Sequence, residues 1–201
     1  MSKVLVTGFD AFGKHQQNTS EVIIKHLAQL YGNQVVTAVL RTSYSASSAS
    51  IRDLMITEYP DAVLLLGQAA STKCIRIERF ARNRCSTSHV DNDGERGPNR
   101  IISEAPPIYP STLPLKEITC RLHQAQIRYA VSTNAGSFVC NHAFFVASNQ
   151  AREMGKMVSV GFMHVPAAGG FDRSSLHTSL IPGITIAIET LLEMPVLRPS
   201  A

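Results

Sequence analysis

The chain has 201 residues, of which 44% are hydrophobic and 17% are charged. This composition is typical of a globular protein, and the length suits one hydrophobic core, so we expect a single domain over residues 1–201. No apolar run approaches the roughly 20 residues that a membrane span needs. The N-terminus enters a strand-like run without a signal-peptide pattern, so we expect a cytoplasmic protein with no membrane partner.

The formal charge of +4 comes from 19 basic and 15 acidic residues, which is a modest excess. The one basic cluster lies between Lys73 and Arg84, and Glu78 is its only acid. Few aromatic residues are interleaved with these charges, as a platform for single-stranded nucleic acid would require. We therefore expect no nucleic-acid partner.

Strand-like and helix-like segments alternate along the chain. We expect strands at 4–7, 35–40 and 62–66, with a helix from Ser20 to Tyr31 and another at 47–59. An aperiodic segment follows at 85–114. Beyond it we expect helices at 115–126 and about 141–154, strands at 130–133 and 157–164, and a last helix at about 175–193, interrupted near Pro182. This alternation predicts a three-layer α/β/α fold with a central, mostly parallel, twisted sheet.

Two patterns suggest cofactors and are rejected. Residues 8–15, GFDAFGKH, resemble a phosphate-binding loop, but His15 offers no hydroxyl to a magnesium ion and the next helix begins too late. Cys120 and His123 have a metal-ligand spacing, as do Cys140 and His142, yet neither pair has a matching second pair. The four cysteines also show no CxxC pairing. We expect no metal and no cofactor.

The segment NAGSFVCNHAFF, residues 134–145, places Cys140 between a turn and an apolar helix. A cysteine among phenylalanines is more often a small buried hydrophobic residue than a nucleophile. Its position favours a nucleophile instead, because the dipole and free amides of a helix N-terminus lower the pKa of a thiol. The same amides could hold the oxyanion of a tetrahedral intermediate.

A thiolate nucleophile needs a base, and His164 is the best-placed candidate. It ends a predicted strand, and ligands of open α/β sheets bind at the carboxyl ends of strands. We expect the strand before Cys140 to end at the same edge of the sheet. Three acids could orient the imidazole, namely Glu78, Asp91 and Asp172, and their spacing does not choose among them.

Four motifs together resemble one family. TGFDAFG, IERFARN, SFVCNH and GFMHVP are similar to motifs of the pyroglutamyl-peptidase I (pyrrolidone carboxyl peptidase) family, and the similarity covers most of the chain. The resemblance implies a Cys-His-Glu triad of Cys140, His164 and Glu78. It also implies pyroglutamyl peptides as substrates and a homo-oligomer, commonly a tetramer.

The resemblance further places Phe9, Phe12, Phe138, Val139 and Gln68 around a pyroglutamyl pocket. Aromatic faces suit a flat lactam ring, and Gln68 could pair with its polar edge. The alternatives are that Phe9 and Phe12 belong to the core and that Gln68 only satisfies a loop. Three features depart from the family pattern: NTS at 18–20 in place of the more usual NPS, the basic character of the tract around Glu78, and Ser88-His89-Val90 where many bacterial members carry an arginine.

These features predict a cysteine exopeptidase that removes N-terminal L-pyroglutamate from peptides through a thioester. One alternative is a thiol amidohydrolase acting on another small cyclic amide. Another is a catalytically silent binding protein that keeps the fold.

Overall fold

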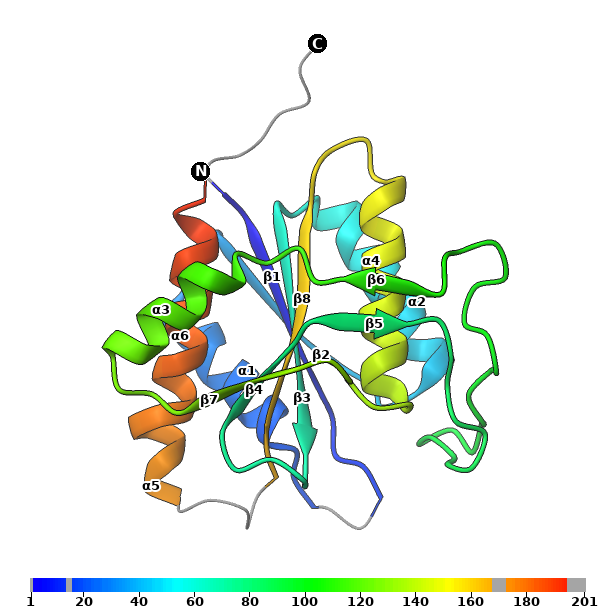
Figure 1. The fold of residues 1–201 in the computed structure, drawn as a ribbon, viewed down its shortest axis with the longest axis horizontal. Helices are drawn as coiled ribbons and strands as arrows, with labels where there is room; N and C mark the ends of the chain where they lie inside the picture. Colours follow the sequence, from blue (N-terminus) through cyan, green and yellow to red (C-terminus); the bar gives the residue numbers. More distant parts are fainter. Residues whose placement is uncertain (1, 14–15, 168–172, 195–201) are drawn as a thin grey trace.

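The computed structural model describes residues 2–13, 16–167 and 173–194 (Figure 1). A six-stranded sheet in the order β2-β1-β3-β8-β4-β7 forms its centre. These strands are β1 (Val4–Phe9), β2 (Val35–Leu40), β3 (Ala62–Ala69), β4 (Ile75–Glu78), β7 (Tyr129–Ser132) and β8 (Ser159–Pro166).

The sheet is mostly parallel, as predicted. β1 pairs in parallel with β2 and β3, β3 pairs in parallel with β8, and β4 pairs in parallel with β7. Only the β4–β8 pair is antiparallel. The short strand β4 therefore reverses the direction of the last two strands relative to the first four.

Helices cover both faces of the sheet, which confirms the predicted α/β/α layers (Figure 1). α1 (Thr19–Leu30), α3 (Leu115–Gln124) and α6 (Ile181–Leu192) pack on one face. α2 (Tyr44–Glu58) and α4 (Val139–Glu153) pack on the other. The last helix is interrupted before Pro182, as predicted, because α5 (Arg173–Ser175) and the π-helix η1 (Leu176–Leu180) precede α6.

Alternation along the strands divides the core between these two faces. Val4, Val6, Leu64 and Leu66 belong to the cluster under α1 and α6, whereas Leu5, Val63 and Leu65 belong to the cluster under α2 and α4. Residues two apart on a strand share a face. The same alternation puts Phe162 on the α4 face, and it fixes which strand residues can reach the start of α4.

Several predicted boundaries shift, and side-chain caps explain the shifts of α1 and α2. α1 begins at Thr19, one residue before the expected start. Asn18 is its N-cap residue, because the Asn18 side chain accepts a hydrogen bond from the Ser20 amide. α2 begins three residues earlier than expected, since Ser43 caps it. β8 runs two residues past His164, and α4 begins two residues before Asn141.

The aperiodic segment contains one short strand that the sequence did not predict. β6 (Ile108–Pro110) pairs antiparallel with β5 (Phe80–Arg82), and β5 packs against α4. Strands of three residues are too short to show a period, which is why they were missed. Among the helices described here, none is long and apolar enough to cross a bilayer.

Candidate active site

Cys140 is the second residue of α4. Phe138 is the N-cap residue in an extended conformation, and it provides no side-chain hydrogen bond to the first turn. The first amides of an α-helix have no partner within the helix. An apolar cap therefore leaves the amides beside Cys140 available to a ligand, as the sequence predicted.

The thiol of Cys140 lies against the sheet at Gly67. A Cβ atom built on Gly67 would be 2.8 Å from Cys140 Sγ and 2.6 Å from Phe162 Cζ. Gly67 is in register with His164 on the adjacent strand β8, and the rings of Phe162 and His164 are 4.7 Å apart. Cys140 and His164, predicted from the sequence as nucleophile and base, thus both lie next to Gly67.

The route by which they meet differs from the prediction. β7, the strand before Cys140, is parallel to β4, and β4 is antiparallel to β8. The carboxyl ends of β7 and β8 therefore point in opposite directions, so the expectation of a shared edge was wrong. The connection from β7 to α4 brings Cys140 to Gly67 instead.

His164 is buried and held by Glu78. Its Nδ1 atom is 2.8 Å from Glu78 Oε1, and Glu78 is fully buried on β4. Since an ionised carboxylate only accepts, Nδ1 is the protonated nitrogen, which leaves the Nε2 lone pair free to act as a base. Arg76 Nε also donates to Glu78 Oε1, at 2.7 Å.

The pKa directions define the resting charges of this cluster. Burial alone would raise the pKa of Glu78, but its contacts with His164, Ser132 and Arg76 bring that pKa below its usual value. Burial lowers the pKa of His164 more than Glu78 raises it. The carboxylate is therefore charged and the imidazole neutral near pH 7.

The resting thiol differs from the prediction. The pKa of Cys140 is raised to about 12, mainly by burial and secondly by the charge of Glu78, while Arg76 opposes the increase. Desolvation thus outweighs the helix N-terminus, and the expected low thiol pKa was wrong for the free site. Cys140 rests as a thiol and must transfer its proton as it attacks.

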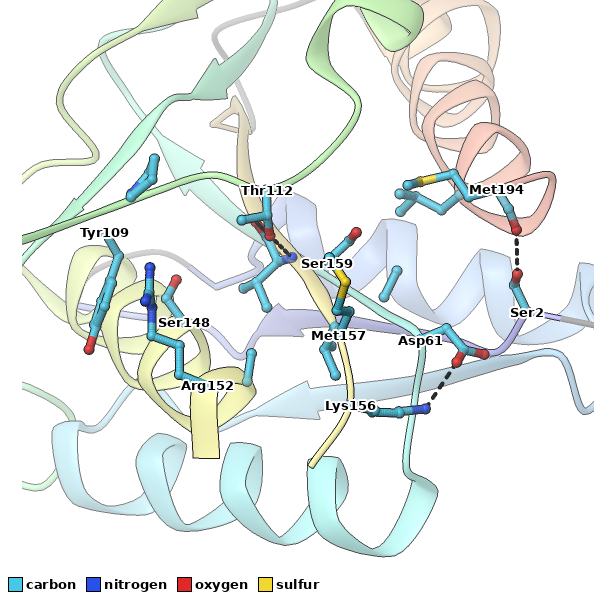
Figure 2. A pocket seen from close by; sticks show the side chains of 16 residues that line it. Ser2, Asp61, Tyr109, Thr112, Ser148, Arg152, Lys156, Met157, Ser159 and Met194 are labelled. Atoms are coloured by element: carbon cyan, nitrogen blue, oxygen red, sulfur yellow. Dashed lines mark hydrogen bonds and ion pairs between the residues drawn. The ribbon is translucent and has the colours of Figure 1, made fainter. Parts of the chain in front are cut away.

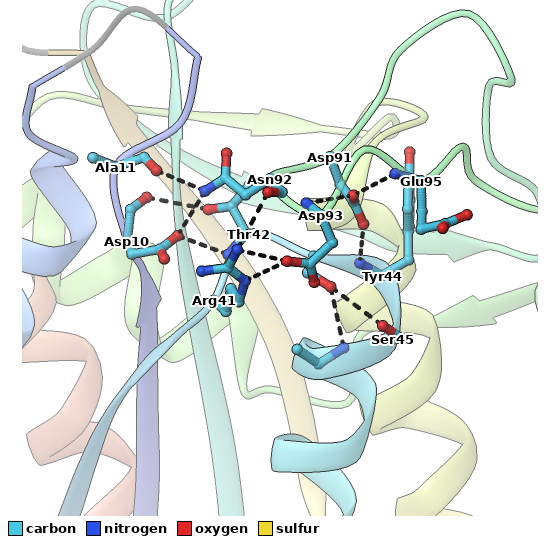
Figure 3. A network of polar contacts seen from close by, with 12 residues as sticks. Asp10, Ala11, Arg41, Thr42, Tyr44, Ser45, Asp91, Asn92, Asp93 and Glu95 are labelled. Carbon is cyan, nitrogen blue, oxygen red and sulfur yellow. Dashed lines mark hydrogen bonds and ion pairs between the residues drawn. The ribbon is translucent and has the colours of Figure 1, made fainter.

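Asp91, a second candidate for the orienting acid, has another role. Its carboxylate accepts from the backbone amides of Tyr44, Asp93 and Glu95 at 2.8–2.9 Å (Figure 3). In the same network, Asp10 accepts from the amide of Thr42 at 2.7 Å. Asp91 thus anchors its own loop to the start of α2, away from His164. Asp172, the third candidate, lies outside the described residues.

Aromatic rings gather beside the start of α4. Phe138 is central: its ring centroid is 4.8 Å from that of Phe12, 5.6 Å from Tyr44 and 6.2 Å from His89. Phe12 and Phe138 are only partly buried, which leaves ring surface for a ligand. Partly exposed aromatic rings next to a cysteine can bind a small flat ring.

Comparison with known proteins identifies the family. A family model described as pyroglutamyl peptidase matches residues 2–193. The chain belongs to the pyroglutamyl peptidase family. This confirms the resemblance inferred from the four sequence motifs.

Relatives and solved structures agree with this membership. The pyrrolidone-carboxylate peptidase of Thermococcus kodakarensis is 36% identical, with 95% of this chain and 96% of that protein covered. A pyrrolidone-carboxylate peptidase of Ralstonia nicotianae is 35% identical, at 96% and 94% coverage. Among solved structures, pyroglutamyl peptidase I of Bacillus amyloliquefaciens gives a TM-score of 0.86 at 29% identity, with 96% of each chain covered.

Three residues that were expected to line the pocket have other surroundings: two are buried in the core, and one is hydrogen-bonded at the start of α1. Phe9 is 2% exposed and Val139 is 1% exposed, so both lie behind Phe12 and Phe138 in the core. Gln68 occupies the strand position after Gly67, and successive side chains point to opposite faces. Its Oε1 accepts from the amide and hydroxyl of Thr19, at 2.8 and 3.1 Å. Gln68 caps the start of α1, which is the loop-satisfying alternative.

A large cavity of about 560 Å³ lies at the other end of the sheet (Figure 2). Its walls include Ala62 and Ser159, the first residues of β3 and β8. Gly67 and His164 are five residues further along these strands, roughly 16 Å away at about 3.3 Å per residue. Neither cysteine nor histidine is among the described residues that line the cavity. Its size therefore does not make it the reaction site of this pyroglutamyl peptidase.

Sequence reasoning missed Arg76 and Tyr44. Arg76 was given no role within the basic cluster between Lys73 and Arg84, but it is two residues before Glu78 on one face of β4 and donates to that carboxylate. If the segment Ile-Arg-Ile-Glu had been recognised as a strand, its alternation would have predicted that Arg76 and Glu78 share a face. Tyr44 is 5% exposed and is the first residue of α2, three residues before the expected start of that helix, and no motif marked it.

Proposed function

We propose that this pyroglutamyl peptidase removes N-terminal L-pyroglutamate from peptides with Cys140 as nucleophile, His164 as base and Glu78 as the orienting acid. One observation carries the assignment: the 2.8 Å contact between buried Glu78 and His164 Nδ1, beside the Gly67 backbone against which the Cys140 thiol lies. A buried carboxylate is costly unless it is paired and hydrogen-bonded, and Glu78 meets this condition through Arg76 and the Nδ1–H group of a neutral His164. A base oriented toward a thiol at an uncapped helix start is suited to acyl transfer.

Acylation begins from a neutral thiol and a neutral imidazole. His164 Nε2 takes the proton from Cys140 while sulfur attacks the acyl carbon of the pyroglutamyl residue. The resulting imidazolium is stabilised by Glu78, which remains ionised. The imidazolium then protonates the leaving amine, the C–N bond breaks, and a thioester remains on Cys140.

Deacylation uses the same groups. His164 removes a proton from water, and the hydroxide attacks the thioester carbon. Sulfur leaves and regains its proton from the imidazolium, which restores the resting site and releases pyroglutamate. No cofactor enters either step. Both tetrahedral intermediates carry an oxyanion, and the unpartnered amides at the start of α4 are the donors we assign to it.

We assign recognition of the lactam to Phe12 and Phe138. Their partly buried rings offer apolar surface to the flat five-membered ring, and Phe9 and Val139 belong to the adjoining core cluster. Gln68 lies on the opposite face of β3, and its oxygen already accepts two hydrogen bonds, so we assign it no contact with the lactam. Main-chain groups supply the polar contacts in this proposal.

We further propose that the protein is cytoplasmic and assembles as a homo-oligomer, commonly a tetramer in this family. Supporting the first point, all four cysteines are free thiols, as a reducing compartment would keep them. Light scattering on a size-exclusion column measures the assembly directly. A monomer at micromolar concentration would contradict the second point.

A chromogenic pyroglutamyl amide tests the activity. We expect turnover by the wild type, loss of it in Cys140→Ala, and no loss in Cys120→Ala, whose thiol is exposed. Activity only on a different cyclic amide would favour a thiol amidohydrolase of other specificity. Binding of pyroglutamyl peptides without turnover would favour a silent binding protein.

A further inference from the structure

Arg76 is the residue of the basic tract that enters the catalytic cluster. Its Nε donates to Glu78 Oε1 at 2.7 Å, and its Nη2 lies 3.3 Å from His164 Nδ1. Its Nη1 donates to Ser71 Oγ at 3.3 Å, which fixes the far side of the guanidinium. Neighbouring arginines point elsewhere: Arg79 lies over the ring of Phe80, and Arg82 contacts the carbonyl of Thr133.

We propose that Arg76 is a positioning residue that aims the Glu78 carboxylate at His164 and keeps the free imidazole neutral at mildly acidic pH. This inference rests on the proposed role of His164 as base. It concerns how the chain tunes that base, through a side chain that touches the triad and, in the proposed mechanism, no reacting atom.

The aiming follows from hydrogen-bond geometry. Glu78 Oε1 is shared by Arg76 Nε and His164 Nδ1, so the guanidinium holds the oxygen that orients the ring. Two groups compete for Nδ1: the carboxylate at 2.8 Å, and Arg76 Nη2 at 3.3 Å. The carboxylate prevails because its contact is shorter by 0.5 Å, and since a carboxylate only accepts, this selects the Nδ1–H tautomer. Nε2 is then free to accept the thiol proton.

The charge effect separates two kinds of protonation. A proton taken from solvent adds a positive charge to His164 beside Arg76, and that repulsion acts in full. A proton passed from Cys140 to His164 leaves the net charge unchanged, and the attraction between Arg76 and the thiolate then offsets part of the repulsion between Arg76 and the imidazolium. Arg76 therefore opposes inactivation by acid more strongly than it opposes the reaction.

The charged groups around His164 support this separation. Glu78 and Arg76 face it from β4, and Cys140 approaches from α4 beside Gly67 of β3. Arg76 lowers the pKa of both His164 and Cys140, whereas Glu78 raises both. Among the described residues, Arg76 is the cation that lies in contact with the imidazole.

The experiment compares Arg76→Gln, Arg76→Lys and the control Arg79→Gln. Arg79 is exposed and directly follows β4, so its replacement removes the same charge close to Glu78 without touching the contacts of Arg76. For Arg76→Gln we expect the acid limb of kcat/KM to move about one unit toward neutral pH, a loss of about tenfold at acidic pH. The loss on the plateau should be smaller. Arg76→Lys keeps the charge and should retain most of the wild-type profile, and Arg79→Gln should match the wild type.

A second readout does not depend on turnover. Nitrogen-15 NMR of the His164 ring in the Cys140→Ser protein, with and without Arg76→Gln, follows the imidazole titration directly. Titration of His164 at higher pH in the Arg76→Gln protein supports the inference even if no pyroglutamyl substrate is cleaved. An unchanged His164 titration, or an acid limb of Arg76→Gln identical to that of the wild type, overturns it.

Discussion

Gly67 on β3 leaves the space that the thiol of Cys140 occupies. A methyl group at this position would lie 2.8 Å from Cys140 Sγ and 2.6 Å from Phe162 Cζ, closer than Cβ atoms pack in proteins. The ring of Phe162 in turn packs 4.7 Å from that of His164. The absence of a side chain at residue 67 therefore lets the Cys140 thiol lie beside the β3 residue that is in register with His164.

Gly67→Ala should displace the thiol and lower kcat on the order of 10²-fold, since a misplacement of about 1 Å can cost that much. Gly155→Ala is the matched control, because nothing lies within 4 Å of the added methyl there. Steady-state kinetics of both variants, with circular dichroism to confirm folding, decides the outcome. Wild-type kcat in a folded Gly67→Ala protein would mean that the thiol does not need this position.

Glu78→Gln should lower kcat far more than it changes KM. The amide can still hold the ring but cannot stabilise the imidazolium, so we expect a loss on the order of 10²- to 10⁴-fold. The variant also leaves Arg76 without its carboxylate partner, so the double variant Arg76→Gln/Glu78→Gln serves as the control. A folded Glu78→Gln enzyme with normal kcat would require another acid to orient His164.

The parts of the fold that the sequence predicted are those with long apolar periods. β1, β3 and most helices fell close to their expected positions because each buries an apolar run or stripe. β4 was missed because a four-residue strand of alternating isoleucine and charge resembles a basic surface tract. Its antiparallel pairing with β8 then overturned the assumption of a common strand edge.

The candidate site was predictable in its residue types and not in its electrostatics. Cys140 and His164 could be selected from their places at a helix start and near a strand end. Glu78 was chosen by family resemblance, since Asp91 was equally well spaced. The raised thiol pKa could not be predicted, because it depends on burial by Phe162, Gly67 and their neighbours, which are far apart in the chain.

Phe12 and Phe138 should determine specificity, whereas Phe9 should determine stability. Removing either partly exposed ring takes apolar surface from the cleft and should cost about 1–3 kcal/mol in kcat/KM for pyroglutamyl amides. Phe9→Ala removes a ring that is 2% exposed and should lower the free energy of unfolding by about 3–5 kcal/mol.

The measurement pairs urea unfolding with kcat/KM for pyroglutamyl and prolyl amides. Proline lacks the lactam carbonyl and adds a charged amine, so the wild type should discriminate strongly against it. Equal rates on the two amides would refute a lactam pocket. Discrimination that survives both Phe12→Ala and Phe138→Ala would place the pocket elsewhere.

His142 should make the protein sensitive to acid although it is no part of the proposed triad. It is 6% exposed on α4, with Nδ1 3.4 Å from Ser48 Oγ and its ring 5.2 Å from that of Tyr44. Burial lowers its pKa to about 4. In the unfolded chain a histidine has a pKa of about 6.5, so between these values the unfolded state binds more protons than the folded state.

The free energy of unfolding should therefore fall as the pH drops from about 6.5 to about 4, by about 2–4 kcal/mol from this residue alone. His164 and Glu78, whose pKa values are also lowered, add losses of the same sign. His142→Gln removes the titrating group, so its unfolding free energy, measured in urea at several pH values, should change less over this range than that of the wild type. His123→Gln, on the surface of α3, is the control and should keep the wild-type slope. Equal slopes in the His142→Gln and wild-type proteins would show that His142 is protonated in the folded state at little cost.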